Sequence, residues 1–194
     1  MIQSKADLKY YLEEDRKALG IKKTFSFRQF FLPNRIWKFE KRLRYMEYYK
    51  NVPSLWHKIM FVVTGIRFKR ISEHLGFSIP ANVFGPGLSI AHYGTIVVNP
   101  QTKVGANCRL HACVNIGASG GSKKAPSIGD NVYIGPGAII FGDIVIPDNV
   151  TIGANATVNK SFDTENCVLA GTPAEIVKTN MPNWITFNNK GNGN

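Results

Sequence analysis

Histidine is the side chain best suited to accept and return a proton near neutral pH, because its unperturbed pKa is about 6.5. The chain contains four histidines. His57 and His74 lie in a basic first part of the sequence, where we expect surface or packing roles. His92 and His111 lie further on, 19 residues apart, and are the candidates for acid–base chemistry. The alternative is that each is a structural polar residue in a turn.

Both candidates lie in a segment with a six-residue period, and that period predicts how they are positioned. A period of six fits neither an α-helix, with 3.6 residues per turn, nor an alternating strand. It is typical of a solenoid in which three short strands form a triangular coil of about 18 residues. Because nearly one coil separates the histidines, we expect them to stack on neighbouring coils. The periodic aliphatic residues are Val98, Val104, Leu110, Ile116, Ile128, Ile134, Ile140, Ile146, Ile152 and Val158.

One interruption of the repeat is a second candidate for chemistry. The interval between Ile116 and Ile128 is 12 residues, so residues 117–127 (GASGGSKKAPS) replace one repeat. We expect this loop to stand out from the solenoid, with Lys123 and Lys124 adding positive charge. A flexible, solvated insertion is the alternative interpretation.

Residues 1–78 follow a different pattern, in which apolar residues alternate with basic ones at intervals of three or four. This pattern predicts helices over residues 5–19, 35–50 and about 54–75. The net charge of the chain is +11, and residues 1–78 contribute +10 of it, with 17 Lys and Arg against 7 Asp and Glu. The sequence therefore predicts a mainly β protein with a basic α-helical head (1–78), a β-helix (79–178) and a polar, asparagine-rich C-terminal tail (179–194).

Composition and motifs argue against several functional classes. With 44% apolar and 19% charged residues, the chain is globular. The three cysteines show neither zinc-finger nor redox spacing, and only two histidines lie in the solenoid, so we expect no metal. No helix-turn-helix, RRM or zinc motif accompanies the positive charge, so we expect no nucleic-acid partner. The opening residues lack a secretory pattern and the longest apolar run, 59–66, is short, so the expected location is cytoplasmic.

Three segments carry a resemblance to a known family: IAHYGT at residues 90–95, VNIG at 114–117 before the glycine-rich loop, and AGTPAEIV at 170–177. With the repeats, they make residues 79–178 similar to the hexapeptide-repeat acyltransferases. The likeness is greatest to the serine acetyltransferase branch and to related O-acetyltransferases of bacterial polysaccharide synthesis. It implies a left-handed parallel β-helix, a homotrimer with active sites between subunits, and acetyl-CoA as co-substrate without a metal.

The resemblance also implies roles for single residues. His92 occupies the position of the catalytic histidine and would be the general base, while His111 would be an acceptor ligand or a second base. In the loop, the candidates are the oxyanion donors Gly117 and Ala118 and the cations Lys123 and Lys124, which would meet CoA phosphates or an anionic acceptor. For CoA, the resemblance implicates Gly135, Gly137, Ala154 and Asn155 along the pantetheine arm, although the glycines also have a structural use at corners. Lys160 and Lys178 suit the phosphates or adenine by their charge.

Polar residues that the serine acetyltransferase branch uses are missing from this chain. In an ungapped alignment, the aspartate that orients the catalytic histidine falls at Phe77, and a second aspartate falls at Ala91. The loop's basic residue and histidine read Lys124 and Ala125. A site without these groups should bind the charged ends of serine poorly, because their desolvation goes uncompensated. We therefore expect a sugar hydroxyl on a polysaccharide precursor as acceptor, with serine as the alternative and a noncatalytic scaffold as the alternative of another class.

The basic, aromatic-rich head adds an expectation about partners. Its cationic side chains suit either peripheral contact with the inner face of the membrane or a contact that builds assemblies larger than a trimer. A solvated basic face is the simpler interpretation.

Overall fold

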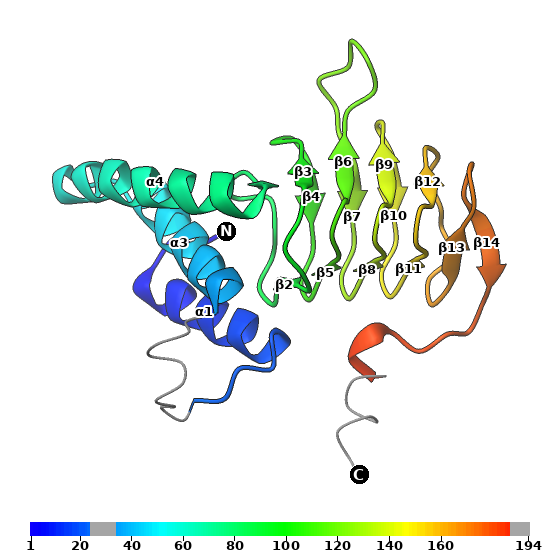
Figure 1. Cartoon of the computed structure of the whole chain (residues 1–194), viewed down its shortest axis with the longest axis horizontal. Helices are drawn as coiled ribbons and strands as arrows, with labels where there is room; N and C mark the ends of the chain where they lie inside the picture. The colour runs from blue at the N-terminus through cyan, green and yellow to red at the C-terminus, as the bar shows by residue number, and fades with distance from the viewer. Residues whose placement is uncertain (24–33, 187–194) are drawn as a thin grey trace.

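The structure, a computed structural model, describes residues 1–23 and 34–186. A helical head joins one end of a solenoid of short strands (Figure 1). The described helices are α1 (Lys5–Ala18), α3 (Arg35–Asn51) and α4 (Leu55–Leu75). The strands are β1 (Phe77–Ser78), β2 (Ser89–Ile90), β3 (Ile96–Val98), β4 (Lys103–Val104), β5 (Arg109–Leu110), β6 (Asn115–Gly117), β7 (Ser127–Ile128), β8 (Tyr133–Ile134), β9 (Ile139–Phe141), β10 (Val145–Ile146), β11 (Thr151–Ile152), β12 (Thr157–Val158), β13 (Val168–Ala170) and β14 (Glu175–Lys178). The predicted fold class, a left-handed parallel β-helix with an N-terminal α-helical region, is confirmed.

Polar side chains explain where the described helices begin. Ser4, Asn34 and Ser54 each accept a hydrogen bond from the backbone N–H three residues further on, at 3.0, 3.0 and 3.1 Å. Such caps satisfy N–H groups that have no partner inside the helix. Gly76 ends α4 in the left-handed conformation, with φ of 77°, which glycine adopts without strain. The three predicted helices are confirmed to within about one residue at each end.

Three sheets form the sides of the solenoid. Sheet A has the order β1-β3-β6-β9-β12, sheet B has β10-β7-β4, and sheet C has β14-β13-β11-β8-β5-β2. Each complete coil passes from sheet C to sheet A and then to sheet B. All ten periodic aliphatic residues point inward and are at most 6% exposed. Because burying one such side chain contributes about 1.5–3 kcal/mol, this inner column is the main stabilising feature of the solenoid.

Asparagines, rather than glycines, make the corner between sheets B and C. Asn107, Asn131 and Asn149 have φ of 57°, 59° and 60°, in the left-handed region that asparagine tolerates better than most residues. Their side-chain amides form a ladder, with Nδ2–Oδ1 distances of 3.0 Å between successive coils. This asparagine ladder thus joins successive coils at one corner.

The last strand corrects one prediction. The sequence predicts parallel coils up to residue 178, but β14 runs antiparallel to β13, with Ala170 opposite Glu175. Only residues 171–174 separate the two strands. A connection this short permits a hairpin but not another parallel coil. β14 therefore covers the last edge of sheet C, which would otherwise present unpaired backbone groups.

The C-terminal segment is also more ordered than a polar tail. Residues 179–186 turn back beneath the solenoid (Figure 1), and Trp184 is only 7% exposed. Its indole Nε1 donates to the carbonyl of Asn107 at 2.9 Å, and the Arg109 guanidinium lies 5.5 Å from its ring centroid. One buried aromatic residue thus holds this segment on sheet C. Residues 187–194 of the predicted tail lie outside the described residues.

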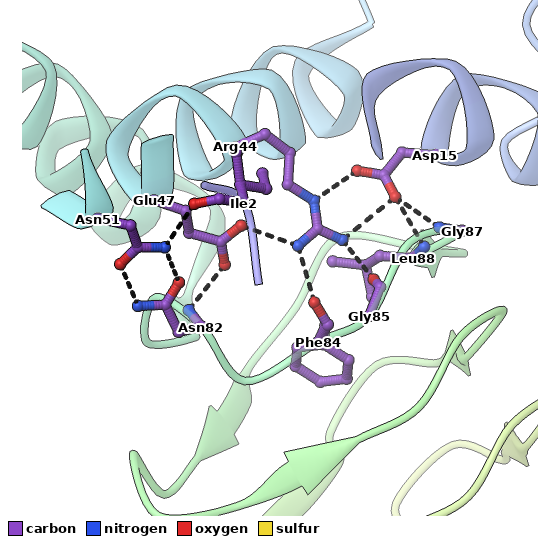
Figure 2. Close-up of polar contacts among 10 residues, drawn as sticks. All are labelled: Ile2, Asp15, Arg44, Glu47, Asn51, Asn82, Phe84, Gly85, Gly87 and Leu88. Carbon is purple, nitrogen blue, oxygen red and sulfur yellow. Dashed lines mark hydrogen bonds and ion pairs between the residues drawn. The ribbon is translucent and has the colours of Figure 1, made fainter. Parts of the chain in front are cut away.

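A buried ion-pair network joins the head to the first coil (Figure 2). Arg44 of α3 and Asp15 of α1 are fully buried, with Nε and Oδ2 2.7 Å apart. All five N–H donors of Arg44 are used: on both oxygens of Asp15, on Glu47, and on the carbonyls of Phe84 and Gly85. Burial alone would lower the pKa of Arg44, but the carboxylates of Glu47 and Asp15 raise it above its ordinary value. The guanidinium therefore stays charged.

The carboxylates extend this network into the backbone of the first coil. Asp15 Oδ1 accepts the N–H groups of Gly87 and Leu88 at 2.8 and 2.9 Å. Glu47 Oε1 accepts the N–H of Asn82 at 2.8 Å (Figure 2). Each carboxylate thus serves both the guanidinium and the loop that leads into β2.

Glu40 is a third acidic residue buried in this joint. Its Oε1 accepts the N–H of Ile90 at 3.3 Å, while its Oε2 is buried without a partner among the described residues. Burial, followed by the negative charge of Asp15, raises the pKa of Glu40 well above its ordinary value, against the opposing effects of Ile90 and Arg44. Glu40 therefore keeps its proton to a higher pH than an ordinary glutamate does.

Replacing Arg44 with methionine tests the network. We expect Arg44→Met to lower the free energy of unfolding by about 3–5 kcal/mol, because two carboxylates stay buried without their counter-charge. Urea unfolding followed by circular dichroism measures this loss. The exposed Arg67→Met variant is the control and should change stability by less than about 0.5 kcal/mol. A loss for Arg44→Met as small as that of the control would contradict the assigned role.

Replacing Glu40 with glutamine tests the protonated carboxyl. A carboxyl whose pKa is higher in the folded state than in the unfolded state stabilises the fold while it is protonated. This contribution is complete below the unfolded-state pKa and is lost as the pH rises through the folded-state pKa. We therefore expect the Tm of the wild-type protein to fall more steeply than that of Glu40→Gln between pH 6 and alkaline pH. Thermal melts over that range measure the difference, with the exposed Glu73→Gln as control. Parallel curves for all three proteins would show that Glu40 is ionised throughout.

Candidate active site

His92 and His111 lie at one corner of the solenoid, where the chain passes from sheet C to sheet A. They follow β2 and β5, which are neighbours in sheet C. The Ala91 N–H donates to the Leu110 carbonyl at 2.9 Å and aligns the two coils. The ring centroids of His92 and His111 are 5.7 Å apart, with an angle of 56° between the rings. The structure thus brings the two candidate histidines together on adjacent coils.

His111 is half-buried, and its environment keeps it neutral. Burial, followed by the positive charges of Arg109 and His92, lowers the pKa of His111 below its ordinary value. Its ring lies 5.0 Å from that of Tyr133 on the next strand of sheet C. The Nε2 atom is buried and has no hydrogen-bond partner among residues 1–23 and 34–186. A buried polar atom is normally paired, so this nitrogen is available to a neighbouring ring or to a bound molecule.

His92 is exposed, and no described carboxylate makes a hydrogen bond that would orient its ring. Phe77, at the position of the family's orienting aspartate, is 3% exposed and packs edge-on against Phe39 with ring centroids 5.1 Å apart. Ala91, at the position of the second aspartate, has no polar side chain. Within the described part of the chain, no carboxylate hydrogen-bonds to the His92 ring. The polar ring that lies beside His92 is the imidazole of His111.

The residues predicted to hold the pantetheine arm lie at this same corner, on later coils. Hydrogen bonds between coils hold them in place. The backbone N–H groups of Gly135, Gly137 and Asn155 each donate to a backbone carbonyl of an adjacent coil, at 2.8, 3.0 and 2.9 Å. Those three N–H groups are therefore engaged inside the solenoid and cannot also bind a ligand. The N–H of Ala154 makes no such backbone bond in the described structure, and Ala154 is exposed. Of the four candidates, Ala154 alone offers a free amide donor.

Gly135 also has a packing reason to be glycine. A Cβ at this position would lie 2.8 Å from the backbone nitrogen of Ala154 on the next coil. Real Cβ atoms essentially never approach backbone that closely, so a side chain here would push two coils apart. The structure therefore explains Gly135 without a ligand.

The two predicted phosphate-binding lysines lie at the C-terminal end of the solenoid. Lys160 follows β12, and its Nζ pairs with Glu175 of β14 at 2.6 Å. Lys178 is an exposed residue of β14. Since an ion pair exposed to solvent is worth at most about 1 kcal/mol, Lys160 can exchange Glu175 for a phosphate group at little cost.

The loop of residues 117–127 leaves the solenoid at another corner, between sheets A and B, and rises above the neighbouring turns (Figure 1). Gly117 and Ala118 begin it, and Lys123 and Lys124 lie in its exposed part. Lys124 Nζ pairs with Asp143 at 2.7 Å, which raises the pKa of Lys124. A single chain therefore does not bring the predicted oxyanion donors and cations beside the histidines.

Tyr133 and Arg109 are neighbours of the site that the sequence analysis missed. Each is the outward-facing residue immediately before an inward aliphatic residue, and the two are paired in register. The six-residue frame contains this signal, because the position before each periodic aliphatic residue must face outward.

No group of three or more His, Cys, Asp or Glu side chains in the described ranges is arranged to hold a metal ion.

Comparison with known proteins places the repeat in a family. Residues 125–160 match the family described as bacterial transferase hexapeptide (six repeats). The chain is 34% identical over 134 residues to a serine acetyltransferase of Staphylococcus xylosus, which covers 68% of this chain and 59% of that protein. It is also 34% identical over 105 residues to a serine acetyltransferase of Mycobacterium tuberculosis, covering 53% of this chain and 45% of that protein. The chain thus spans about half the length of these relatives.

The fold agrees with the sequence similarity. The crystal structure of a serine acetyltransferase from Neisseria gonorrhoeae superimposes with a TM-score of 0.70 at 26% identity, covering 92% of this chain and 69% of that one. Coverage this high includes the head as well as the β-helix. With its hexapeptide repeat, its fold and its sequence relatives, the chain belongs to the hexapeptide-repeat acyltransferases, in the serine acetyltransferase-like branch.

Proposed function

We propose that the protein is an O-acetyltransferase that moves an acetyl group from acetyl-CoA to a hydroxyl, with His92 as the general base. The observation that carries this proposal is the corner at which the exposed ring of His92 lies 5.7 Å from the ring of His111, whose Nε2 has no hydrogen-bond partner among the described residues. Family membership supports acetyl-CoA as the donor. In a purely structural histidine, a buried ring nitrogen is normally hydrogen-bonded.

The reaction needs a base because an alcohol is a weak nucleophile at neutral pH. His92 takes the proton of the acceptor hydroxyl as its oxygen attacks the thioester carbonyl. The tetrahedral intermediate then collapses, the C–S bond breaks, and the imidazolium of His92 returns the proton to the departing CoA thiolate. The products are an acetyl ester and free CoA, and His92 is neutral again.

His111 takes the place of the missing aspartate in this proposal. Its neutral imidazole accepts a hydrogen bond from the His92 ring after a small rotation, because hydrogen bonds in catalytic sites are often long until substrate binds. This contact holds the His92 ring and leaves its other nitrogen directed at the acceptor. His111 is thus a positioning residue rather than a second base.

The remaining parts of the site come from a neighbouring subunit in the proposed trimer. Because the loop of residues 117–127 and the histidines occupy different corners, two chains side by side can bring the loop of one to the histidines of the other. Gly117 and Ala118 would then donate to the oxyanion. CoA would run along the histidine corner, with Ala154 N–H on the pantetheine arm and the positive end at Lys160 and Lys178.

The sequence relatives support serine as the acceptor, and the proposal takes serine first. Two observations favour a second candidate, a sugar hydroxyl on a polysaccharide precursor. Phe77 is buried among aromatic side chains, and Ala91 and Ala125 replace polar groups that the resemblance associates with serine binding. Serine carries an ammonium and a carboxylate next to its hydroxyl, and both need partners in the site, whereas a sugar ring presents its hydroxyl without adjacent charges.

Replacing His92 with asparagine tests the base. We expect His92→Asn to lower kcat/KM by about 100-fold or more, because general-base catalysis contributes about 10²–10⁴. CoA release from acetyl-CoA, followed with a thiol reagent, measures turnover on serine and on a panel of nucleotide sugars. His74→Asn is the control outside the site. Turnover on serine alone selects the first candidate and turnover on sugars the second, while full activity of His92→Asn would exclude this base.

Replacing His111 separates positioning from binding. We expect His111→Leu to lower kcat about tenfold with the KM values of both substrates unchanged, and His111→Gln to recover part of the loss because its amide still accepts a hydrogen bond. Steady-state kinetics with the identified acceptor measure this split. A raised KM for the acceptor at unchanged kcat would make His111 an acceptor ligand instead.

A further inference from the structure

Helix α4 exposes a continuous apolar face that neither the core nor the proposed reaction uses. We call it the α4 face: Leu55, Trp56, Ile59, Val62, Val63 and Ile66, which are 79%, 64%, 52%, 58%, 36% and 51% exposed. These positions fall on one side of a helix with 3.6 residues per turn. The opposite side, which includes Thr64, Ile71 and Leu75, is buried against the rest of the protein. Six adjacent exposed apolar side chains on one helix are typical of a contact surface rather than of scattered surface residues.

The position of the α4 face suits contact with something outside the molecule. The first turns of α4 lie at the end of the protein farthest from β14 and extend past α3 (Figure 1). Ser54 caps this end of the helix, so the exposed turns are well formed up to their first residue. None of the described helices is both long and apolar enough to cross a bilayer.

Cationic side chains border the α4 face on both sides. At 100° per residue, Lys58 and Lys69 fall along one edge and Arg67 along the other. All three are exposed. The helix contains no acidic residue before Glu73, and residues 1–78 together carry 17 Lys and Arg against 7 Asp and Glu. The face is therefore apolar at its centre and positive at its rim.

This charge pattern decides between the two occupants that fit an exposed apolar helix. A second copy of the chain would bring two heads of net charge +10 against each other, and the like charges would oppose the contact. A surface of anionic lipid headgroups complements the same charges. Lysine and arginine beside an apolar face place their stems in the apolar region and their charged ends among headgroups, and tryptophan is enriched at this boundary.

We propose that the α4 face docks the protein on the surface of an anionic bilayer, with the apolar side chains entering the headgroup boundary and the flanking cations meeting lipid phosphates. Such helices lie in the plane of the interface and do not span the membrane. This interaction goes beyond the proposed function and does not depend on it, because no residue of the histidine corner takes part.

Vesicle co-sedimentation of the full chain tests the proposal. The probes are vesicles of phosphatidylcholine alone and of phosphatidylcholine with about 30% phosphatidylglycerol, where that share gives a surface potential that attracts basic segments. We expect binding to the anionic vesicles and at least tenfold weaker binding to the neutral ones. Raising the salt to about 0.5 M should weaken the electrostatic part of the binding.

Two variants connect binding to the α4 face. The double variant Trp56→Ser, Ile59→Ser should bind anionic vesicles at least tenfold more weakly, with Tm unchanged because both side chains are exposed. Tyr10→Ser removes an exposed aromatic ring from α1 and should bind like the wild type. The proposal is overturned if the wild type does not bind anionic vesicles, or if the double variant binds them normally. It is also overturned if the double variant changes only the oligomeric mass in light scattering, which would assign the face to a second copy.

Discussion

The arrangement of this protein depends on one buried guanidinium. Arg44 connects three segments: α1 through Asp15, α3 to which it belongs, and the first coil through the carbonyls of Phe84 and Gly85. Removing a charge from water costs several kcal/mol, and that cost is recovered only where the hydrogen-bonding groups are matched, as all five N–H donors are here. Apolar contacts would be non-directional. These bonds instead fix the path of the chain into β2, and β2 leads directly to His92.

The solenoid uses most of its backbone groups to hold its coils together, and this limits what the backbone can do for a ligand. At the histidine corner, the N–H groups of Gly135, Gly137 and Asn155 are engaged between coils, so side chains and the amide of Ala154 remain. The loop that carries Gly117, Ala118 and two lysines leaves from another corner. A triangular solenoid separates its corners by whole sheets, so a site that needs both must draw on a second chain.

The identity of the acceptor is where similarity and local chemistry diverge. Relatives of this chain include serine acetyltransferases, and the fold shared with one of them extends over the head. At the corner itself, however, Phe77 belongs to an aromatic cluster, and the ring of His92 lies beside another imidazole, that of His111. A neutral imidazole orients a base less strongly than a carboxylate does, because its hydrogen bond carries no charge. The proposed acetyl transfer rests on family membership, while the choice between the two proposed acceptors rests on these few substitutions.

The sequence by itself determined the solenoid and the three described helices, and it named His92 as the candidate base. Ten aliphatic residues at six-residue intervals specify the inward positions of the solenoid whatever residues face outward. Helix caps such as Ser54 and Gly76 act on backbone groups only a few residues away. Tertiary structure alone decided that Arg44, Asp15 and Glu47 meet, that Trp184 folds back onto Asn107, and that β14 reverses direction. It also decided that the loop and the histidines lie at different corners. The six-residue period predicts which residues point inward in each coil. It does not predict contacts between residues distant in sequence, because their pairing depends on how the coils and the head are assembled.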